Sequence, residues 1–333
     1  MGTALRLLAA ALVTVGCLYF ALRGTEWAEV RHVLAGTHLG WVAMMVPVSV
    51  ITVYVRALRW RVLLSGVERL PVRPLFSATA VGFMANMLLP LRAGEIIRPV
   101  LLGRQTKVST SAALASVLLE RLFDLLLIFV FLLGISIAVP VPAWMGRASY
   151  VVAAGIVAIL VLLVVLLRSR ERAVAGIRRA LAHLPGDLGH GVSTVVDSFL
   201  GGVSSINDGR TIATLLVYSF MVWAVIACTF GLGLLALDLN VPLAAGSVSL
   251  MIVVAAFVSL PQAPGFVGTW QAGCVFALAF YGVSKEQAIG YSLVTHVVQV
   301  VVNVLLGVLC LLTDHLGLRE LVALAEREKR DQS

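Results

Sequence analysis

Charged residues are scarce in this sequence: they make up 13% of the 333 residues, whereas hydrophobic residues make up 60%. A soluble domain of this length needs a larger share of polar side chains to cover its core. The composition never shifts over a stretch as long as a soluble domain. The sequence therefore predicts an all-α integral membrane protein, with one transmembrane domain over residues 1–316 and a cytoplasmic tail over 317–333.

Familiar catalytic motifs are also missing. The chain has no HExxH, GxSxG or P-loop sequence, and its acidic residues are not spaced as a metal site. Its four cysteines lie in apolar segments and suit small buried hydrophobic residues. We therefore expect no enzymatic activity and no cofactor. The net charge of +8 comes without an aromatic-basic patch, so nucleic acid is not an expected partner.

Long apolar runs are what the chain does contain. Six of them approach or exceed the roughly 20 residues that cross a bilayer, namely residues 4–22, 39–57, 110–137, 149–168, 211–236 and 287–313. Lys and Arg concentrate on alternate connections, as they do in cytoplasmic loops. This alternation predicts six crossings with both termini in the cytoplasm. Between two of the spans, residues 169–208 predict short amphipathic helices on the cytoplasmic surface.

Two further apolar regions, residues 75–104 and 246–282, are interrupted by prolines and glycines at about 89–95 and 261–268. Such residues break helices, and each remaining half is too short to cross alone. Irregular backbone at membrane depth survives only where protein or a wet cavity surrounds it. We therefore predict two re-entrant helical hairpins, the alternative being a pair of kinked or very short spanning helices.

The two interrupted regions also resemble each other. Pro90 and Gly94 recur 174 residues later as Pro264 and Gly268. Three predicted spans separate the breaks, and an odd number of crossings inverts the second copy. Inverted repeats of this kind are typical of transporters, whose substrate sites lie at broken helices near the membrane midplane. The predicted repeat units are residues 75–137 and 246–313.

Ionisable side chains at membrane depth are costly and usually functional. The first unit supplies six of them: Arg92, Glu95, Arg98, Glu120, Arg121 and Asp124. Glu120 and Asp124 are four residues apart and so share one helix face. One hypothesis gives these residues a role in transport. The other makes them an ion-pair network that holds the hairpin to the long helix.

The break in the first unit favours an anionic ligand. The half-helix that starts near Gly94 should begin inside the membrane with free backbone amides, and Arg92 stands beside that start. Arg56, Arg59 and Arg61, expected just after the second span, could gather lipid phosphates at the cytoplasmic face. The alternative for these three arginines is ordinary positive-inside anchoring.

The second repeat unit offers polar side chains in place of the charged ones of the first unit. Gln271, His296 and Gln299 suit the polar wall of a cavity, and His296 could relay protons or simply form interhelical hydrogen bonds. Gly265 and Gly268, together with the glycine of the first break, would let backbone approach a ligand.

Four strings of this sequence resemble one known family: residues 59–64 (RWRVLL), 86–95 (NMLLPLRAGE), 120–124 (ERLFD) and 264–271 (PGFVGTWQ). In this order they are similar to the lysylphosphatidylglycerol synthase transmembrane region, the flippase-like domain family, over nearly the whole chain. The resemblance implies a helical membrane domain that moves lipid between leaflets. The aminoacyl transferase domain of the best-known members has no counterpart within these 333 residues, so synthase activity is not implied.

The chain departs from the family pattern at two positions. Gln271 stands where the family often has Glu, and Phe266 stands where it often has a second Gly. A mechanism that needs a carboxylate in both units is therefore not expected to apply unchanged.

Together these patterns predict a flippase or transporter in the cytoplasmic membrane of a bacterium or an archaeon. Its partner would be an anionic phospholipid or a polyprenyl-phosphate lipid, with proton coupling and oligomerisation possible. The alternatives are a membrane enzyme that modifies a lipid head group and a non-transporting scaffold of a lipid-synthesis complex.

Overall fold

The computed structural model describes residues 3–90, 92–138, 154–155, 157–158, 209–260 and 263–314. All regular structure in these ranges is helical, as predicted. The predicted span 149–168 lies almost wholly outside the described residues. The predicted linker 169–208 and tail 317–333 lie outside them entirely.

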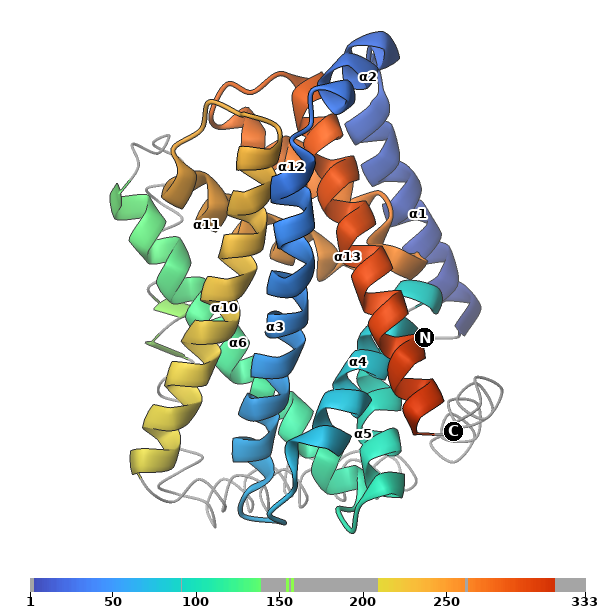
Figure 1. Ribbon diagram of the computed structural model, residues 1–333, viewed down its shortest axis with the longest axis vertical. Helices are drawn as coiled ribbons and strands as arrows, with labels where there is room; N and C mark the ends of the chain where they lie inside the picture. The colour runs from blue at the N-terminus through green and yellow to red at the C-terminus, as the bar shows by residue number, and fades with distance from the viewer. Residues whose placement is uncertain are drawn as a thin grey trace.

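The chain runs through its helices in the following order (Figure 1). They are α1 Thr3–Leu22, α2 Trp27–Ala35, α3 Leu39–Leu64, α4 Val72–Leu88, α5 Gly94–Gln105, α6 Thr110–Ala138, α10 Gly209–Ala236, α11 Leu243–Val258, the short 3-10 helix η1 Pro264–Phe266, α12 Thr269–Ala279 and α13 Lys285–Thr313.

Three of these helices, α3, α10 and α13, are long and apolar enough to cross a membrane. The pair α1 and α2 passes the same test together, bent by 81° at the break between them. The predicted helices at 4–22, 110–137, 211–236 and 287–313 are present with ends shifted by one or two residues at most. The short helix α2 was not predicted.

The predicted end of the second helix at residue 57 was wrong. Helix α3 continues to Leu64 and therefore contains Arg56, Arg59 and Arg61, which the sequence placed in a loop. No proline or glycine interrupts the chain between Pro47 and Gly66, so nothing local ends the helix earlier. Buried carboxylates on α6 supply the partners that make charge inside α3 tolerable.

Two helical hairpins occupy opposite ends of the molecule. Helices α4 and α5 pack on each other at the end where α3 terminates, and α11 and α12 pack on each other at the other end (Figure 1). Helices α3, α10 and α13 run along both halves, with α10 packed along α3 and α13 along α4. Each hairpin belongs to its own cluster of buried hydrophobic residues.

The two broken regions have matching dimensions. Helices α4, α5 and α6 contain 17, 12 and 29 residues, and helices α11, α12 and α13 contain 16, 11 and 29. The last helix of each set starts with the same N-cap. The Ser109 hydroxyl accepts a hydrogen bond from the Ala112 amide, as the Ser284 hydroxyl does from the Gln287 amide.

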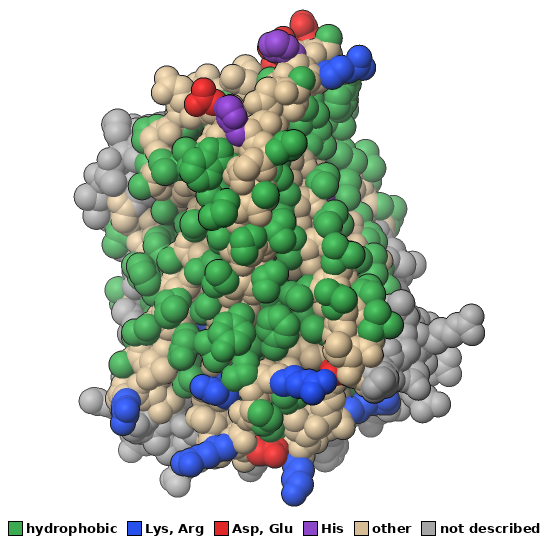
Figure 2. All heavy atoms as spheres, viewed as in Figure 1, with side chains coloured by type: hydrophobic (Ala, Val, Ile, Leu, Met, Phe, Trp, Pro, Cys, Tyr) green, Lys and Arg blue, Asp and Glu red, His purple; other side chains and the backbone are tan. Residues whose placement is uncertain are grey.

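The outer surface is apolar around its middle and charged at its ends (Figure 2). Large exposed hydrophobic side chains cover α1, α3, α10 and α13, for example Leu12, Ile51, Phe220 and Leu305. Lys and Arg side chains gather at the end where α3 terminates and α10 begins. A belt of exposed apolar side chains between polar ends is the surface of a membrane protein.

Candidate functional site

The breaks of the two hairpins meet inside the helical bundle. The Nη2 of Arg92, in the first break, donates a 2.7 Å hydrogen bond to the carbonyl of Val258, the last residue of α11. A Cβ atom added to Gly265 in the second break would lie 3.2 Å from the carbonyl of Met87 on α4. The two irregular segments are therefore in direct contact, although they are more than 160 residues apart in the chain.

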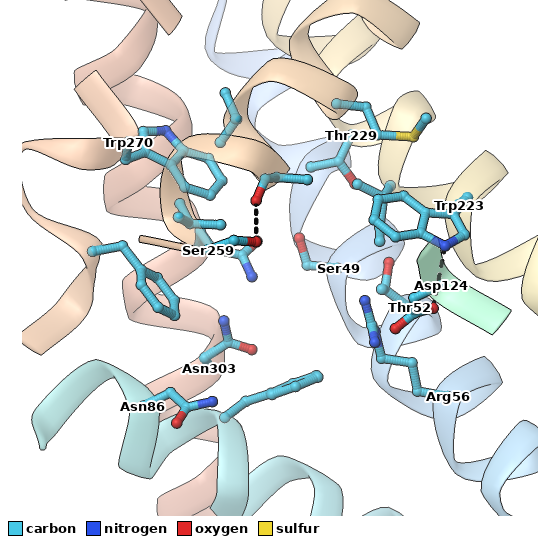
Figure 3. Close-up of a pocket in the computed structure, with 18 of the residues that line it drawn as sticks. Ser49, Thr52, Arg56, Asn86, Asp124, Trp223, Thr229, Ser259, Trp270 and Asn303 are labelled. Carbon is cyan, nitrogen blue, oxygen red and sulfur yellow. Dashed lines mark hydrogen bonds between the residues drawn. The ribbon is translucent and has the colours of Figure 1, made fainter. Parts of the chain in front are cut away.

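A cavity of about 270 Å³ lies beside this contact, between α3, α4, α6, α10, α11 and α13. Five charged side chains line it: Arg56, Arg92, Glu95, Arg121 and Asp124. Arg56 and Asp124 lie across the cavity from Asn86 and Asn303 (Figure 3). The rest of the wall is largely apolar and comes from α10 and α11, for example Ile226, Phe230, Met251 and Val254. The cavity wall thus combines charged, amide and hydroxyl side chains with apolar ones.

Behind the charged part of the wall lies a buried ion-pair network centred on Arg59. Its Nη2 lies 2.6 Å from Oε1 of Glu120 and its Nη1 lies 2.7 Å from Oδ1 of Asp124. Arg59 and Glu120 are completely shielded from solvent. The network joins α3 to α6 at two points one helical turn apart on α6.

Each carboxylate in the network serves more than one arginine. Glu120 also contacts Arg98 at 3.0 Å and Arg56 at 3.6 Å. Asp124 contacts Arg121 at 3.4 Å and accepts a 3.2 Å hydrogen bond from the indole of Trp223 on α10. Sharing lowers the cost of burying these charges, but no carboxylate is left over for an additional cation.

Glu95 completes the set of buried or half-buried charges. Its Oε1 lies 3.3 Å from Arg92 and 3.7 Å from Arg121. The described residues of the network and cavity comprise five arginines, Arg56, Arg59, Arg92, Arg98 and Arg121, and three carboxylates, Glu95, Glu120 and Asp124. Their net charge is therefore +2.

The structure brings together some of the twelve predicted binding residues and separates others. Those that line the cavity are Arg92, Glu95, Arg121, Asp124 and Gln299. Arg98 and Glu120 lie behind the wall in the ion-pair network, where Arg98 also stacks 3.8 Å over the ring of Trp60. Both sequence hypotheses for the charged residues therefore have a structural counterpart: part of the set is a network and part faces the cavity.

The three arginines expected to gather head groups lie in three different environments. Arg61 is exposed at the surface, Arg56 lines the cavity, and Arg59 is buried between two carboxylates. Their placement in a loop was wrong, because all three belong to one continuous helix.

The prediction of free amides at the start of α5 was also wrong. The amide of Gly94 donates to the Asn86 side chain at 2.9 Å, and the next three amides donate to the carbonyls of Arg92 and Ala93. Gly94 has a packing role instead, since a Cβ there would lie 1.8 Å from the Gly82 carbonyl on α4. The first break therefore presents the side chain of Arg92, and not a helix N-terminus, to the cavity.

The predicted residues of the second break form a closed group of hydrogen bonds. The carbonyl of Gly265 lies 2.6 Å from Nε2 of His296, so Nε2 carries a proton, and Nδ1 accepts from Gln271 at 2.9 Å. Gln271 in turn accepts from the amide of Gly268 at 2.8 Å. The ring of Trp270 stacks on His296. Both imidazole nitrogens are engaged, which fits the interhelical hydrogen-bonding alternative for His296.

The glycines of this break have conformational and packing roles. Gly265 and Gly268 have φ values of 70° and 85°, and a Cβ on Gly268 would lie 2.8 Å from the Thr14 carbonyl on α1. Neither glycine lines the cavity described above. The expectation that they admit a ligand to the backbone stays a prediction.

Sequence reasoning missed several cavity residues because their types are common in membrane helices. Ser49, Thr52 and Thr229 are ordinary apolar-helix residues, and Trp223 resembles an interfacial anchor. Asn86 could have been identified from the sequence, because it is the first residue of the 86–95 string. The sequence did not show that its side chain accepts a hydrogen bond from the Gly94 amide.

Phe266 combines a side chain in the cavity wall with a strained backbone. Its φ is 62°, a region that glycine adopts freely and that costs other residues about 1–2 kcal/mol. We expect Phe266→Gly to be more stable to unfolding than Phe266→Ala by about 1 kcal/mol, because the two variants differ only in the Cβ that causes the strain. Thermal unfolding of the purified variants in detergent checks this, and equal stabilities would contradict it.

Comparison with known proteins places the sequence in a family. The family model described as the lysylphosphatidylglycerol synthase TM region matches residues 7–307. A curated protein from Haloferax volcanii, named glycosyltransferase AglD, is 27% identical over 344 aligned positions, which cover 94% of this chain and 55% of that protein. The chain thus spans about half the length of this relative. No solved structure matches the chain.

The match to the family model covers the two hairpins, the cavity and the ion-pair network. It also covers the four sequence strings whose residues build them. The chain therefore belongs to the family of the lysylphosphatidylglycerol synthase transmembrane region.

Proposed function

We propose that this protein moves a lipid with an anionic, phosphate-bearing head group between the leaflets of a cytoplasmic membrane. The observation that carries the proposal is the cavity at the meeting point of the two hairpin breaks, whose wall combines three arginines with apolar side chains of α10 and α11. Arginine is well suited to phosphate because its planar donors match the geometry of the oxygens. The apolar wall suits the start of a lipid tail.

The proposal includes an architecture. Hairpins α4–α5 and α11–α12 would be re-entrant, entering from opposite membrane faces and meeting near the midplane. The matching helix lengths and serine N-caps support an inverted repeat of two units. The arginine-rich end would face the cytoplasm by the positive-inside rule, and the proposal assigns both termini to the cytoplasm.

Movement of the two units against each other would alternate access to the cavity. Arg92 is placed to link this movement to the substrate, because it lines the cavity and also donates to Val258 in the other hairpin. A phosphate that competes for this guanidinium would weaken the contact between the hairpins. Glu95 and Asp124 would balance charge at the cavity or take a coupling proton.

A leaflet-protection assay in proteoliposomes tests the proposal. Fluorescent lipids with different head groups are incorporated, and a membrane-impermeant quencher reports which of them change leaflet. We expect an anionic phospholipid or polyprenyl phosphate to move, and Arg92→Gln to slow it by about tenfold or more, since a charge-assisted hydrogen bond contributes about 1.5–3 kcal/mol.

The matched control is Arg61→Gln, which removes an exposed arginine from α3 outside the cavity. It should leave transport unchanged. Folded protein that moves no lipid under an imposed proton gradient would overturn the proposal and favour the scaffold alternative.

A membrane enzyme that modifies a lipid head group is the second candidate. The observation that favours it is the name of the Haloferax relative, a glycosyltransferase. Mass spectrometry of lipids recovered from the same proteoliposomes, supplied with sugar-nucleotide donors, separates the two functions. A modified head group would support the enzyme, whereas transport alone leaves every lipid mass unchanged.

A further inference from the structure

The charge at the cavity is not balanced by the described residues around it. The Glu120 carboxylate lies 2.6 Å from the guanidinium of Arg59 and 3.0 Å from that of Arg98. The guanidinium of Arg56 lies farther from it, at 3.6 Å. Arg121 divides its contacts between Asp124 at 3.4 Å and Glu95 at 3.7 Å. The short contacts therefore belong to the buried network, and the uncompensated charge falls on the arginines that line the cavity.

These arginines also have donors to spare. Arg92 and Arg121 contact carboxylates no closer than 3.3 Å, and both side chains are about one-third exposed, 30% for Arg92 and 37% for Arg121. Their buried Nε atoms have no partner among the described residues, a feature they share with Arg59 and Arg98 of the network. Arg56 has one loose ion pair and a cation–π contact with Phe83 as its charge partners in the described structure. A buried guanidinium donor without a partner is costly, and a bound oxyanion removes that cost.

The net charge of +2 indicates how much negative charge the ligand carries. Two excess positive charges around the cavity are matched by a ligand that carries two negative charges. A phosphate monoester carries close to two near neutral pH, because its second pKa is about 6. A phosphodiester, the linkage of ordinary phospholipids, carries one. The charge count therefore distinguishes two classes of lipid that share the phosphate group.

The apolar part of the cavity wall indicates what the phosphate is attached to. Met251 and Val254 of α11 and Ile226 and Phe230 of α10 belong to it. A free phosphate ion gains nothing from such a wall, whereas the first carbons of an ester-linked lipid tail would bury apolar area against it.

We infer that the cavity binds the dianionic head group of a lipid phosphate monoester, with Arg56, Arg92 and Arg121 as its ligands. The inference rests on the proposed function and narrows its substrate class. In this inference Arg56 distinguishes a dianionic ligand from a monoanionic one, because its guanidinium forms the weakest ion pair with the protein among the three arginines.

Binding of two matched probes to the purified full chain in detergent tests this. One probe is farnesyl monophosphate and the other is its methyl phosphodiester, which has the same tail and one charge fewer. We expect the monoester to bind at least about tenfold more tightly at pH 7.5, since each 1.4 kcal/mol of added interaction is tenfold in affinity. Below pH 6 its affinity should fall toward that of the diester, whose own affinity should stay flat.

Arg56→Gln should reduce the ratio between the two affinities, and Arg61→Gln should leave it unchanged. Arg56 has no short ion pair, so its loss should not prevent folding. Equal binding of both probes at every pH would overturn the inference while leaving lipid transport intact. Binding of neither probe would count against the proposed function itself. If inorganic phosphate binds as tightly as the monoester, the result would support a ligand with two negative charges. It would overturn the inference that the phosphate is attached to a lipid.

Discussion

Replacing Glu120 by Gln is expected to lower the free energy of unfolding by about 3–5 kcal/mol, the usual cost of removing one partner from a buried ion pair. Glu120 is completely buried and lies within 3.0 Å of Arg59 and Arg98. Gln keeps the shape of the side chain but removes its charge, which leaves Arg59 paired with Asp124 alone and takes from Arg98 the carboxylate that it contacts. Thermal unfolding in detergent, with the yield of folded protein, measures the effect.

Glu95→Gln is the matched control for this prediction. Glu95 also contacts two arginines, but at 3.3 and 3.7 Å, and its side chain is 32% exposed. Ion pairs in such partly wet positions contribute about 0–1 kcal/mol. A Glu120→Gln protein as stable as Glu95→Gln would show that the buried network does not hold α3 to α6.

Replacing Gly94 by Ala is expected to cost about 4 kcal/mol or more, or to abolish folding. The added Cβ would lie 1.8 Å from the Gly82 carbonyl and 2.7 Å from Oδ1 of Asn86. Neither obstacle can move easily, because one is helix backbone and the other is the side chain that accepts the Gly94 amide. Helices α4 and α5 would have to separate, which would open the first hairpin. The same unfolding measurement applies.

Alanine substitutions at two other glycines provide reference values for this experiment. At Gly82 an added Cβ would meet the nearest atoms at 3.0 and 3.1 Å, so we expect a smaller loss from Gly82→Ala. At Gly134 on α6 nothing lies within 4 Å, so Gly134→Ala should be neutral or slightly stabilising. The order of stability should therefore be Gly134→Ala, then Gly82→Ala, then Gly94→Ala. Any other order would show that the hairpin relaxes around the extra carbon.

Both predictions concern residues that the sequence singled out for a different reason. Gly94 was expected to expose helix amides to an anion, and the amide is instead occupied by Asn86. Glu120 was expected at the binding site, and it lies behind it. In each case the residue type indicated a special position correctly. The spacing along the chain could not show which neighbour makes the position special.

The Arg59 and Arg56 pair shows the same limit. The two residues lie three positions apart on α3, yet one is neutralised by two short ion pairs and the other faces the cavity. A hydropathy scale gives the two residues the same value, because both are arginines. The difference arises because α6 presents its carboxylates to one of them more closely, and that depends on how the two helices cross.

The sequence by itself determined the helical class of this protein, the two breaks and the positions of the long helices that the structure describes, apart from the end of α3. These features follow from local properties, since apolar run length and the conformations of proline and glycine act on a residue and its near neighbours. The tertiary structure alone decided which arginines are neutralised and which line the cavity. Ion pairs such as Arg59–Glu120 and hydrogen bonds such as Arg92–Val258 join residues 61 and 166 positions apart, and their energies depend on distances that only packing sets.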